Sequence, residues 1–368
     1  MTAQAAQRPR YRVGIIACGS IARSHLRAYR EIPAVEVVAG ADISPETRER
    51  WLQEHQIPRM YASVQEMLER EHPDIVSICT WPPLRPEMTE LACAAGVKAI
   101  FAEKPMAVDL AGCDRMIAAA ERSHTVLIVD HQRRYASRFV KARELIDAGA
   151  VGSVEQINIF NGSGDVLTSS THMIDVMRYF LHDAPAEWVM GQVDRRQVER
   201  HNAPVGFQQW EETHMRYGHH VEEGAEALIQ FQGGAHGLVE CGLVSRRRPS
   251  YSATVYGADG MIETSGDPVG PGSGRPQTSA PPLRARVKGE PDWIYPQAVP
   301  NNAQRVAVEE LLGLLKRGGA HPLDMRSARQ VTEIALAIFE SSRRRARIDL
   351  PLAVAANPLV EMIAAGQI

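Results

Sequence analysis

The start of the chain strongly limits how it can fold, because a continuous apolar run is followed at once by a glycine-containing turn. Residues Arg12 to Ala17 read Arg-Val-Gly-Ile-Ile-Ala, as expected of a β-strand covered on both faces. After the turn at Cys18-Gly19-Ser20, side chains recur at the spacing of a helix face, at Ile21, Ala22, His25, Leu26 and Tyr29. This order of strand, turn and helix predicts the first unit of a parallel α/β sheet.

The same alternation continues through the first third of the chain. Further strands are predicted at 35–41, 75–80, 97–102 and 125–129. Ser44-Pro45-Glu46 and the pair Ser63/Glu66 are typical of helix N-termini. We therefore predict a doubly wound parallel sheet of the Rossmann type over residues 1–130.

Past about residue 150 the pattern changes to consecutive strands with few helices between them. Strands are expected at 154–160, 187–193, 227–231, 237–243 and 253–256, with one helix at 173–181 among them. Hairpin-type glycines such as Gly233-Gly234 separate several of them. Two helices near 303–316 and 326–343 follow. The pattern predicts a second, α+β domain over 131–368 with a mostly antiparallel sheet.

Composition excludes several classes of partner. The 368 residues are 44% hydrophobic and 23% charged, with a net charge of −3, so no overall positive field attracts nucleic acid. No run of about 18 apolar residues is present, so we expect no membrane span. The five cysteines are scattered, without a C-x-x-C pair, which favours a reducing cytoplasmic location.

The first turn carries a variant of the dinucleotide-binding fingerprint, with Ala17, Gly19 and Ala22 at its three small-residue positions. Gly19 allows the backbone to approach a pyrophosphate, and the helix N-terminus that begins after Ser20 and Ile21 offers unpaired N–H groups to the phosphates. This motif predicts a cofactor site only because a strand precedes it and a helix follows it.

An acidic residue stands where the ribose would bind. Asp42 ends the second predicted strand, close to the expected distance from Gly19, and its carboxylate suits the ribose hydroxyls. A carboxylate repels a 2′-phosphate, so NAD is favoured, while Arg48 leaves NADP open. The alternative for Asp42 is a helix or turn cap.

The ends of the next two strands carry the remaining candidates for this site. Thr80 and Trp81 follow the third strand, and Glu103-Lys104-Pro105 follows the run 97–102. Because parallel strands bind ligands beyond their carboxyl ends, we expect Thr80, Trp81, Glu103 and Lys104 to line the cofactor. Burial beside a positively charged nicotinamide would favour the neutral amine of Lys104, which makes it a candidate acid/base.

These motifs, together with His172-Met-Ile-Asp175, occur in an order that resembles the Gfo/Idh/MocA oxidoreductases, the glucose–fructose oxidoreductase and inositol dehydrogenase family. The resemblance covers nearly the whole chain. It implies an N-terminal Rossmann domain and a C-terminal domain whose open antiparallel sheet forms homodimers or homotetramers. It also implies hydride transfer between NAD(P) and a secondary alcohol or ketone of a sugar, cyclitol or related polyol.

The resemblance implies that Lys104 and His172 are catalytic, and two positions depart from the family pattern. The aspartate expected four residues before His172 is Thr168, and a histidine often found after the third strand is Arg85. The first departure removes the usual carboxylate–histidine relay. The resemblance also implies one alternative, a glycoside-cleaving enzyme that uses transient oxidation and elimination, and the two departures leave open another, an inactive NAD-binding regulator.

Further side chains are candidates for substrate binding. Arg133 and Tyr135 follow the last Rossmann-type strand, where they suit polyol hydroxyls or an acidic substituent, although interface packing is the alternative. Asp175 lies on the helix side of His172, with a structural hydrogen bond as the alternative. Trp210 and His219 belong to a segment rich in aromatic, imidazole and carboxylate groups that suits a sugar ring, with a plain loop or an oligomer contact as the alternative. Its spacing matches no firm metal motif, so no metal ligand is predicted.

Overall fold

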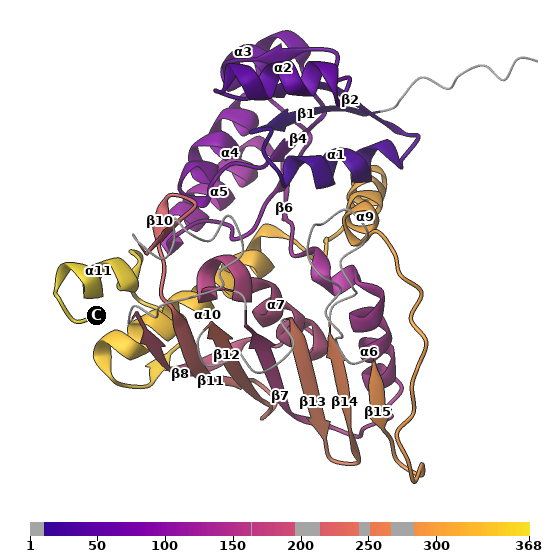
Figure 1. Ribbon diagram of the computed structural model, residues 1–368, viewed down its shortest axis with the longest axis vertical. Coiled ribbons are helices and arrows are strands. Elements are labelled where there is room, and N and C mark those ends of the chain that lie inside the picture. Colours follow the sequence, from indigo (N-terminus) through magenta and orange to yellow (C-terminus); the bar gives the residue numbers. More distant parts are fainter. Residues whose placement is uncertain (1–10, 163, 196–213, 243–250, 266–282) are drawn as a thin grey trace, which may run out of the picture. The chain divides into compact units, whose positions relative to one another are not determined.

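The computed structural model describes residues 11–162, 164–195, 214–242, 251–265 and 283–368, which form two compact units (Figure 1). The first unit contains the chain up to Met106, Gly112–Asp130 and Gln304–Arg326; the second contains Ala107–Ala111, His131–Ala303 and Ser327–Ile368. Residues 304–326 are assigned to the second domain by the sequence pattern, but they fold with the first unit. The reason is pairing with its last strand, since the N–H of Val129 donates to the carbonyl of Leu323 (3.0 Å).

The first unit is built on a six-stranded parallel sheet in the order β3-β2-β1-β4-β5-β6. Its strands are β1 (Tyr11–Ile16), β2 (Val35–Ala41), β3 (Met60–Tyr61), β4 (Ile75–Ile78), β5 (Ala99–Ala102) and β6 (Val126–Val129). Its helices are α1 (Ala22–Arg30), α2 (Pro45–Gln53), α3 (Val64–Glu71), the 3-10 turn η1 (Pro82–Leu84), α4 (Arg85–Ala94), α5 (Leu110–Ser123) and α9 (Ala303–Arg317). This strand order is that of a Rossmann fold, as predicted.

Local sequence signals explain where several of these helices begin. The hydroxyl of Ser44 accepts a hydrogen bond from the N–H of Thr47 (3.0 Å), and that of Ser63 accepts from the N–H of Glu66 (3.4 Å). Every residue of β4 and β5 is buried, which is why these strands are continuous apolar runs. The fold of the first unit therefore follows closely from short-range patterns.

The second unit is built on an eight-stranded sheet in the order β15-β14-β13-β7-β12-β11-β8-β16. The strands are β7 (Val154–Asn161), β8 (Ala186–Asp194), β11 (Gly224–Phe231), β12 (His236–Gly242), β13 (Ser252–Gly257), β14 (Gly260–Ser265), β15 (Arg284–Arg286) and β16 (Ile348–Asp349). The strand pairs are antiparallel except β7 with β12. The predicted mostly antiparallel sheet is confirmed. A separate hairpin pairs β9 (Met215–Arg216) with β10 (His219–His220).

Helices cover one face of this sheet (Figure 1). They are α6 (Ser137–Asp147), a π-helical turn (Val166–Ser170), α7 (Thr171–Phe180) and α10 (Met325–Arg344), with α11 (Pro358–Ala364) and the 3-10 turn η2 (Gln132–Tyr135) beside them. Helix α7 packs so closely that a Cβ at Gly237 would lie 2.2 Å from the sulfur of Met177. The hydroxyl of Ser341 in α10 accepts the N–H of Gly191 in β8 (2.9 Å). The core of this unit therefore lies between the sheet and these helices.

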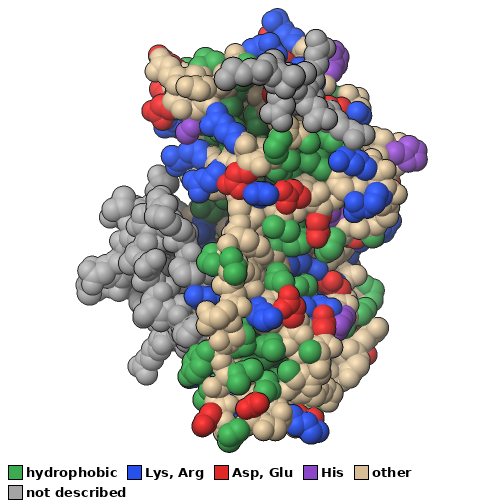
Figure 2. Space-filling view, turned by 90° about the vertical axis from the view of Figure 1, so that its right-hand side faces the viewer, with side chains coloured by type: hydrophobic (Ala, Val, Ile, Leu, Met, Phe, Trp, Pro, Cys, Tyr) green, Lys and Arg blue, Asp and Glu red, His purple; other side chains and the backbone are tan. Residues whose placement is uncertain are grey.

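Charges of both signs are interspersed on the molecular face drawn in Figure 2. Among the described helices, none combines the length and the apolar character that crossing a bilayer requires.

Candidate active site

The turn after β1 has the shape that a dinucleotide requires. Ala17 has φ = 64°, in the left-handed region where glycine is favoured, so the missing first glycine of the fingerprint is replaced at a strained position. A Cβ added to Gly19 would meet no atom of the described residues within 4 Å, apart from its chain neighbours. The backbone at Gly19 therefore borders open space, which fits a pyrophosphate approaching the turn.

The N-terminus of α1 is the second part of this candidate phosphate site. Its cap residue, Ile21, provides no side-chain hydrogen bond, and the first turn contains no acidic residue. Ser20 is exposed beside it, whereas Ala22 is fully buried against the sheet. The first N–H groups of α1 are thus not capped by a side chain of the helix, as an anion-binding N-terminus requires.

Asp42 connects this turn to the end of β2. Its carboxylate accepts hydrogen bonds from the N–H of Cys18 (2.8 Å) and from the N–H of Ser44 (2.9 Å). A carboxylate offers about four acceptor positions, so capacity for ribose hydroxyls is left. Arg48 donates to the carbonyls of Asp42 (2.8 Å) and Ile43 (3.0 Å). Asp42 therefore has the turn-capping role, which is compatible with the predicted ribose role.

Two features of this strand-end edge fit a bound nucleotide. The side chain of Ile43, which the sequence patterns did not single out, is 91% exposed beside Asp42 and offers an apolar surface to an adenine ring. The hydroxyl of Thr80 is buried and has no hydrogen-bond partner among the described residues, so a polar group of a ligand would satisfy it. Trp81 is 58% exposed directly after it.

Lys104 leaves the end of β5 with its backbone fixed by the preceding residue. The Glu103 carboxylate accepts the N–H of Lys104 (3.1 Å), and its other oxygen lies 3.1 Å from Nε2 of His25. The same His25 nitrogen lies 3.4 Å from Asp130, whose carboxylate also accepts a hydrogen bond from Gln304 (2.7 Å). This fully enclosed His25–Glu103–Asp130 triad joins α1 to the ends of β5 and β6.

The environment of the triad shifts the pKa of each of its three groups. Burial alone would lower the pKa of His25, but Cys79, Asp130 and Glu103 together raise it well above its usual value. Burial would raise the pKa of Glu103, yet hydrogen bonding to His25 and the charge of Lys104 hold it at about 2. For Asp130 burial prevails, and its pKa is raised to about 6. The triad is thus an imidazolium between two buried carboxyl groups.

The triad also has the residue types of a cation site, because its three ligand atoms lie within 4.8 Å of one another. The other ring nitrogen of His25 is engaged by Ser77 (3.1 Å). The hydrogen bonds within the triad account for the close approach of its members. We therefore interpret it as a structural support for the Glu-Lys-Pro segment, which the sequence patterns did not reveal.

In the second unit, His172 lies in the first turn of α7 and is 5% exposed. Its ring stands nearly perpendicular to those of His131 (centroids 6.1 Å apart) and Tyr251 (6.3 Å). The guanidinium of Arg133 lies 3.6 Å above the Tyr251 ring. The structure thus brings Arg133 and His172 together through Tyr251, a residue that no local pattern had singled out.

The place of the missing carboxylate is occupied by a different arrangement. The hydroxyl of Thr168 lies 3.0 Å from Nε2 of His219, whose Nδ1 donates to the carbonyl of His220 (2.9 Å). Asp165 caps the π-helical turn by accepting the N–H of Thr168 (2.5 Å), and it pairs with Arg216 (2.9 Å). His219 therefore lies against the segment that leads into α7, with both ring nitrogens engaged.

Glu222 is a second carboxyl group buried beside the π-helical turn. Glu222 accepts the N–H of Val166 (2.5 Å), and its other oxygen is buried with no hydrogen-bond partner in the described part of the chain. Burial and the nearby charge of Asp165 raise the pKa of Glu222 to about 8. It is therefore protonated at neutral pH. Asp165 remains ionised, because Arg216 and His219 lower its pKa against the effect of burial.

The remaining substrate candidates differ in what surrounds them. Both oxygens of Asp175 accept hydrogen bonds from Arg134 (2.7 and 2.8 Å), and Asp175 is 1% exposed, so the geometry favours its structural alternative. Tyr135 is buried, and its carbonyl accepts a hydrogen bond from Asn301 (2.8 Å). Trp210 lies outside the described residues.

Comparison with known proteins agrees with this geometry. Residues 11–131 match the model of the oxidoreductase family with an NAD-binding Rossmann fold, and residues 159–263 match the GFO/IDH/MocA C-terminal domain. The chain is 27% identical to D-apiose dehydrogenase of Paraburkholderia graminis, over 98% of this chain and 95% of that protein. It is 28% identical to inositol 2-dehydrogenase of Ralstonia nicotianae, over 51% of this chain and 59% of that protein.

Solved structures share the fold. An oxidoreductase from Agrobacterium radiobacter, solved in complex with NAD+, L-tartaric acid and magnesium, superimposes with a TM-score of 0.75 at 17% identity. The match covers 92% of this chain and 98% of that one.

Proposed function

Because the chain belongs to the Gfo/Idh/MocA family of NAD-binding oxidoreductases, we propose that it transfers a hydride between NAD and a secondary alcohol or ketone of a sugar, cyclitol or related polyol. The named relatives that act on apiose and inositol support this substrate class. The open turn at Gly19, the uncapped α1 N-terminus and the unpartnered Thr80 hydroxyl fit the cofactor.

The observation that carries the proposal is the placement of Lys104. It follows β5, two strands from β1 in the sheet order, so it emerges at the same strand-end edge as the turn at Gly19. When bound, NAD supplies the hydride acceptor at this edge. Lys104 takes the hydroxyl proton as hydride leaves the carbon, and it returns a proton in the reverse direction. We propose that His172 shares this proton or holds a substrate hydroxyl.

The test is a screen of polyols and keto-sugars with NAD and NADP, followed by the absorbance of the reduced nicotinamide. On the best substrate, Lys104→Met should lower kcat by about 1000-fold, as expected for the loss of a general acid/base. The Kd for NADH should change little. Lys141→Met, which removes a surface lysine of α6, is the matched control. Near-normal kcat in Lys104→Met would refute the assignment.

The same screen separates the alternatives. Cleavage of a glycoside without accumulation of NADH would indicate a net hydrolase that oxidises its substrate transiently. Tight NADH binding with no turnover of any compound would indicate a regulator.

The charge at the end of β2 supports NAD over NADP. In the proposed ribose role, the Asp42 carboxylate would repel a 2′-phosphate, and Arg48 is engaged with two backbone carbonyls. We expect kcat/KM to be higher with NAD, and a higher value with NADP would contradict this role of Asp42.

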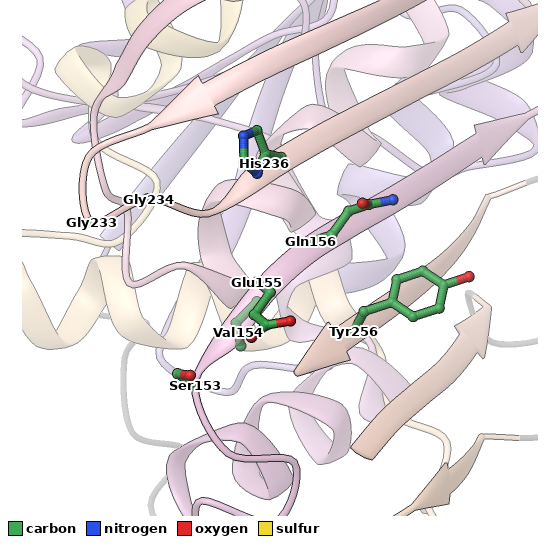
Figure 3. Close-up of a pocket in the computed structure, with 8 residues that line it drawn as sticks. All are labelled: Ser153, Val154, Glu155, Gln156, Gly233, Gly234, His236 and Tyr256. Carbon is green, nitrogen blue, oxygen red and sulfur yellow. The ribbon is translucent and has the colours of Figure 1, made fainter. Parts of the chain in front are cut away.

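We also propose that the outer face of the second sheet mediates homodimers or homotetramers. Met190, Leu228 and Leu238 are cross-strand neighbours on β8, β11 and β12, and Met190 is 52% exposed. Further along this sheet, Gln156, His236 and Tyr256 project from β7, β12 and β13 around a hollow (Figure 3). Met190→Glu should shift the sedimentation coefficient toward the monomer, whereas Leu52→Glu in α2 should not. An unchanged assembly in Met190→Glu would contradict this face.

A cytoplasmic location is part of the proposal. All five cysteines are buried and free, as is common for proteins kept in a reducing compartment. Fractionation of the source cells would test it, and recovery outside the cytoplasm would overturn it.

A further inference from the structure

Arg85 is a buried cation whose hydrogen bonds all go to backbone carbonyls. It is the first residue of α4 and is 5% exposed. Its Nε and Nη2 donate to the carbonyl of Thr80 (3.1 and 2.9 Å), and its Nη1 donates to the carbonyl of Pro105. One side chain thus bridges the segment after β4 and the segment after β5.

This arrangement is costly for the fold. In the described parts of the chain, no carboxylate forms an ion pair with Arg85; Glu103 is the acidic group whose charge acts on it. Burial lowers the pKa of Arg85 to about 10, against the opposing effect of Glu103. Burying a charged side chain costs free energy unless the charge is paired and hydrogen-bonded. A buried arginine used in this way therefore points to a positioning role.

The hydrogen bonds of Arg85 add to those of Glu103, so that the backbone is fixed on both sides of Lys104. On one side, the Glu103 carboxylate holds the Lys104 N–H and is itself held by His25. On the other side, Arg85 holds the carbonyl of Pro105, the residue that follows Lys104. The guanidinium also holds Thr80, whose hydroxyl faces no protein partner. The lysine backbone and the Thr80 segment are thereby fixed relative to one another.

We propose that Arg85 is a positioning residue that sets the Lys104 amine relative to the Thr80–Trp81 segment, an inference that rests on the proposed dehydrogenase function. A neutral histidine at this position has a single N–H and could hold only one of the two segments. A guanidinium has five donors in a fixed fork and holds both. Arg85 thus aligns the acid/base for proton transfer without contacting the reacting atoms.

The kinetic test compares Arg85→Met, Arg85→His and Arg85→Lys with a control, Arg115→Met. The control removes an exposed arginine of α5 that pairs with Glu90 of α4, the helix that begins at Arg85. Misplacement of a reacting group by about 1 Å can cost about 100-fold in rate, so we expect losses of that order in kcat for Arg85→Met. KM and the Kd for NADH should change much less. Arg85→Lys, which keeps the charge and several donors, should recover part of kcat, and Arg115→Met should match the wild type.

Two kinetic results would overturn the proposal. If Arg85→Met keeps kcat near the wild-type value, the bridge does not align Lys104. If NADH affinity and kcat fall in the same proportion, Arg85 belongs to the cofactor site instead.

A second measurement does not depend on turnover. Amide hydrogen exchange should be faster at residues 103–106 in Arg85→Met than in the wild type, while exchange in β1 and β2 stays unchanged. Unchanged protection of 103–106 would refute the bridge even if no substrate is found. Absence of turnover in the wild type, with exchange altered as expected, would count against the dehydrogenase function alone.

Discussion

The segments that carry Lys104 and His172, one in each unit, are stabilised by different kinds of contact. Around Lys104, the supporting groups come from α1, β5 and β6 of one Rossmann sheet, and they form a triad with a cation at its centre. Before His172, Thr168 stands where the resemblance led us to expect an aspartate, and its neighbours are a histidine and a pair of buried acids. The first support is thus a network of ionised groups around one imidazolium, whereas the second combines a contact between a hydroxyl and an imidazole with a buried carboxyl group.

The largest expected effect concerns the buried ion pair between Arg134 and Asp175 of α7. Arg134→Met would leave Asp175 buried without its partner, and we expect a loss of about 3–5 kcal/mol in the free energy of unfolding, measured with urea. Arg115→Met, which breaks an exposed pair, should cost at most about 1 kcal/mol. Equal effects in both variants would mean that the scaffold of His172 does not depend on this pair.

The triad of the first unit should show a characteristic pH dependence. His25→Gln keeps one hydrogen bond but loses the imidazolium, and we expect a cost of about 2 kcal/mol. Because the pKa of His25 is raised on folding, its stabilisation is fully present below its unfolded pKa of about 6.5 and is lost as the pH rises through the folded pKa.

The difference in Tm between wild type and His25→Gln should therefore be largest near pH 6 and should shrink toward alkaline pH. The exposed His124, changed to Gln, is the control. A difference that grows with pH would have the wrong sign for an imidazolium.

The contribution of the Thr168 hydroxyl to stability can be tested by an isosteric substitution. Thr168→Val removes the hydroxyl that contacts His219, and we expect a loss of about 1 kcal/mol in stability. The hydroxyl of Thr171 is buried without a hydrogen-bond partner, so Thr171→Val should cost nothing or stabilise the protein. If chemical denaturation ranks the two variants in the opposite order, the Thr168–His219 contact has no structural weight.

The smallest effect is expected at the turn of the first unit. Ala17→Gly relieves a left-handed alanine, but it also adds freedom to the unfolded chain, so the net gain should be about 0.5 kcal/mol. Gln56 is an exposed residue that also has positive φ, and Gln56→Gly should gain a similar amount without changing NADH affinity. A loss of stability in Ala17→Gly would contradict the strain.

Short-range signals were sufficient for most of the first unit. The apolar runs predicted β1, β2, β4, β5 and β6, and Ser44 and Ser63 begin helices as their side chains require. The two-residue strand β3 was missed, because a strand so short leaves no periodic pattern. Residues 304–326 cluster with the first unit, a grouping that depends on tertiary pairing with β6 and leaves no short-range signal.

The candidate site was less accessible to sequence patterns. Gly19, Asp42 and Lys104 stand in recognisable motifs, whereas the roles of Tyr251, Arg216 and Asp130 depend on contacts between residues far apart in the chain. Asp175 was a reasonable candidate from its helix position, but Arg134, 41 residues away, occupies its carboxylate. A motif specifies a residue type, and only the folded chain shows which groups that residue meets.

The two hydrogen bonds that the Asp42 carboxylate accepts from backbone N–H groups have a practical consequence for redesigning coenzyme preference. Substitution of this acid by a smaller neutral residue, intended to admit an extra phosphate, would also release the N–H groups of Cys18 and Ser44. Engineering of this protein is therefore better begun at Ile43 and Arg48, whose side chains can be changed while the carboxylate continues to fasten the loop.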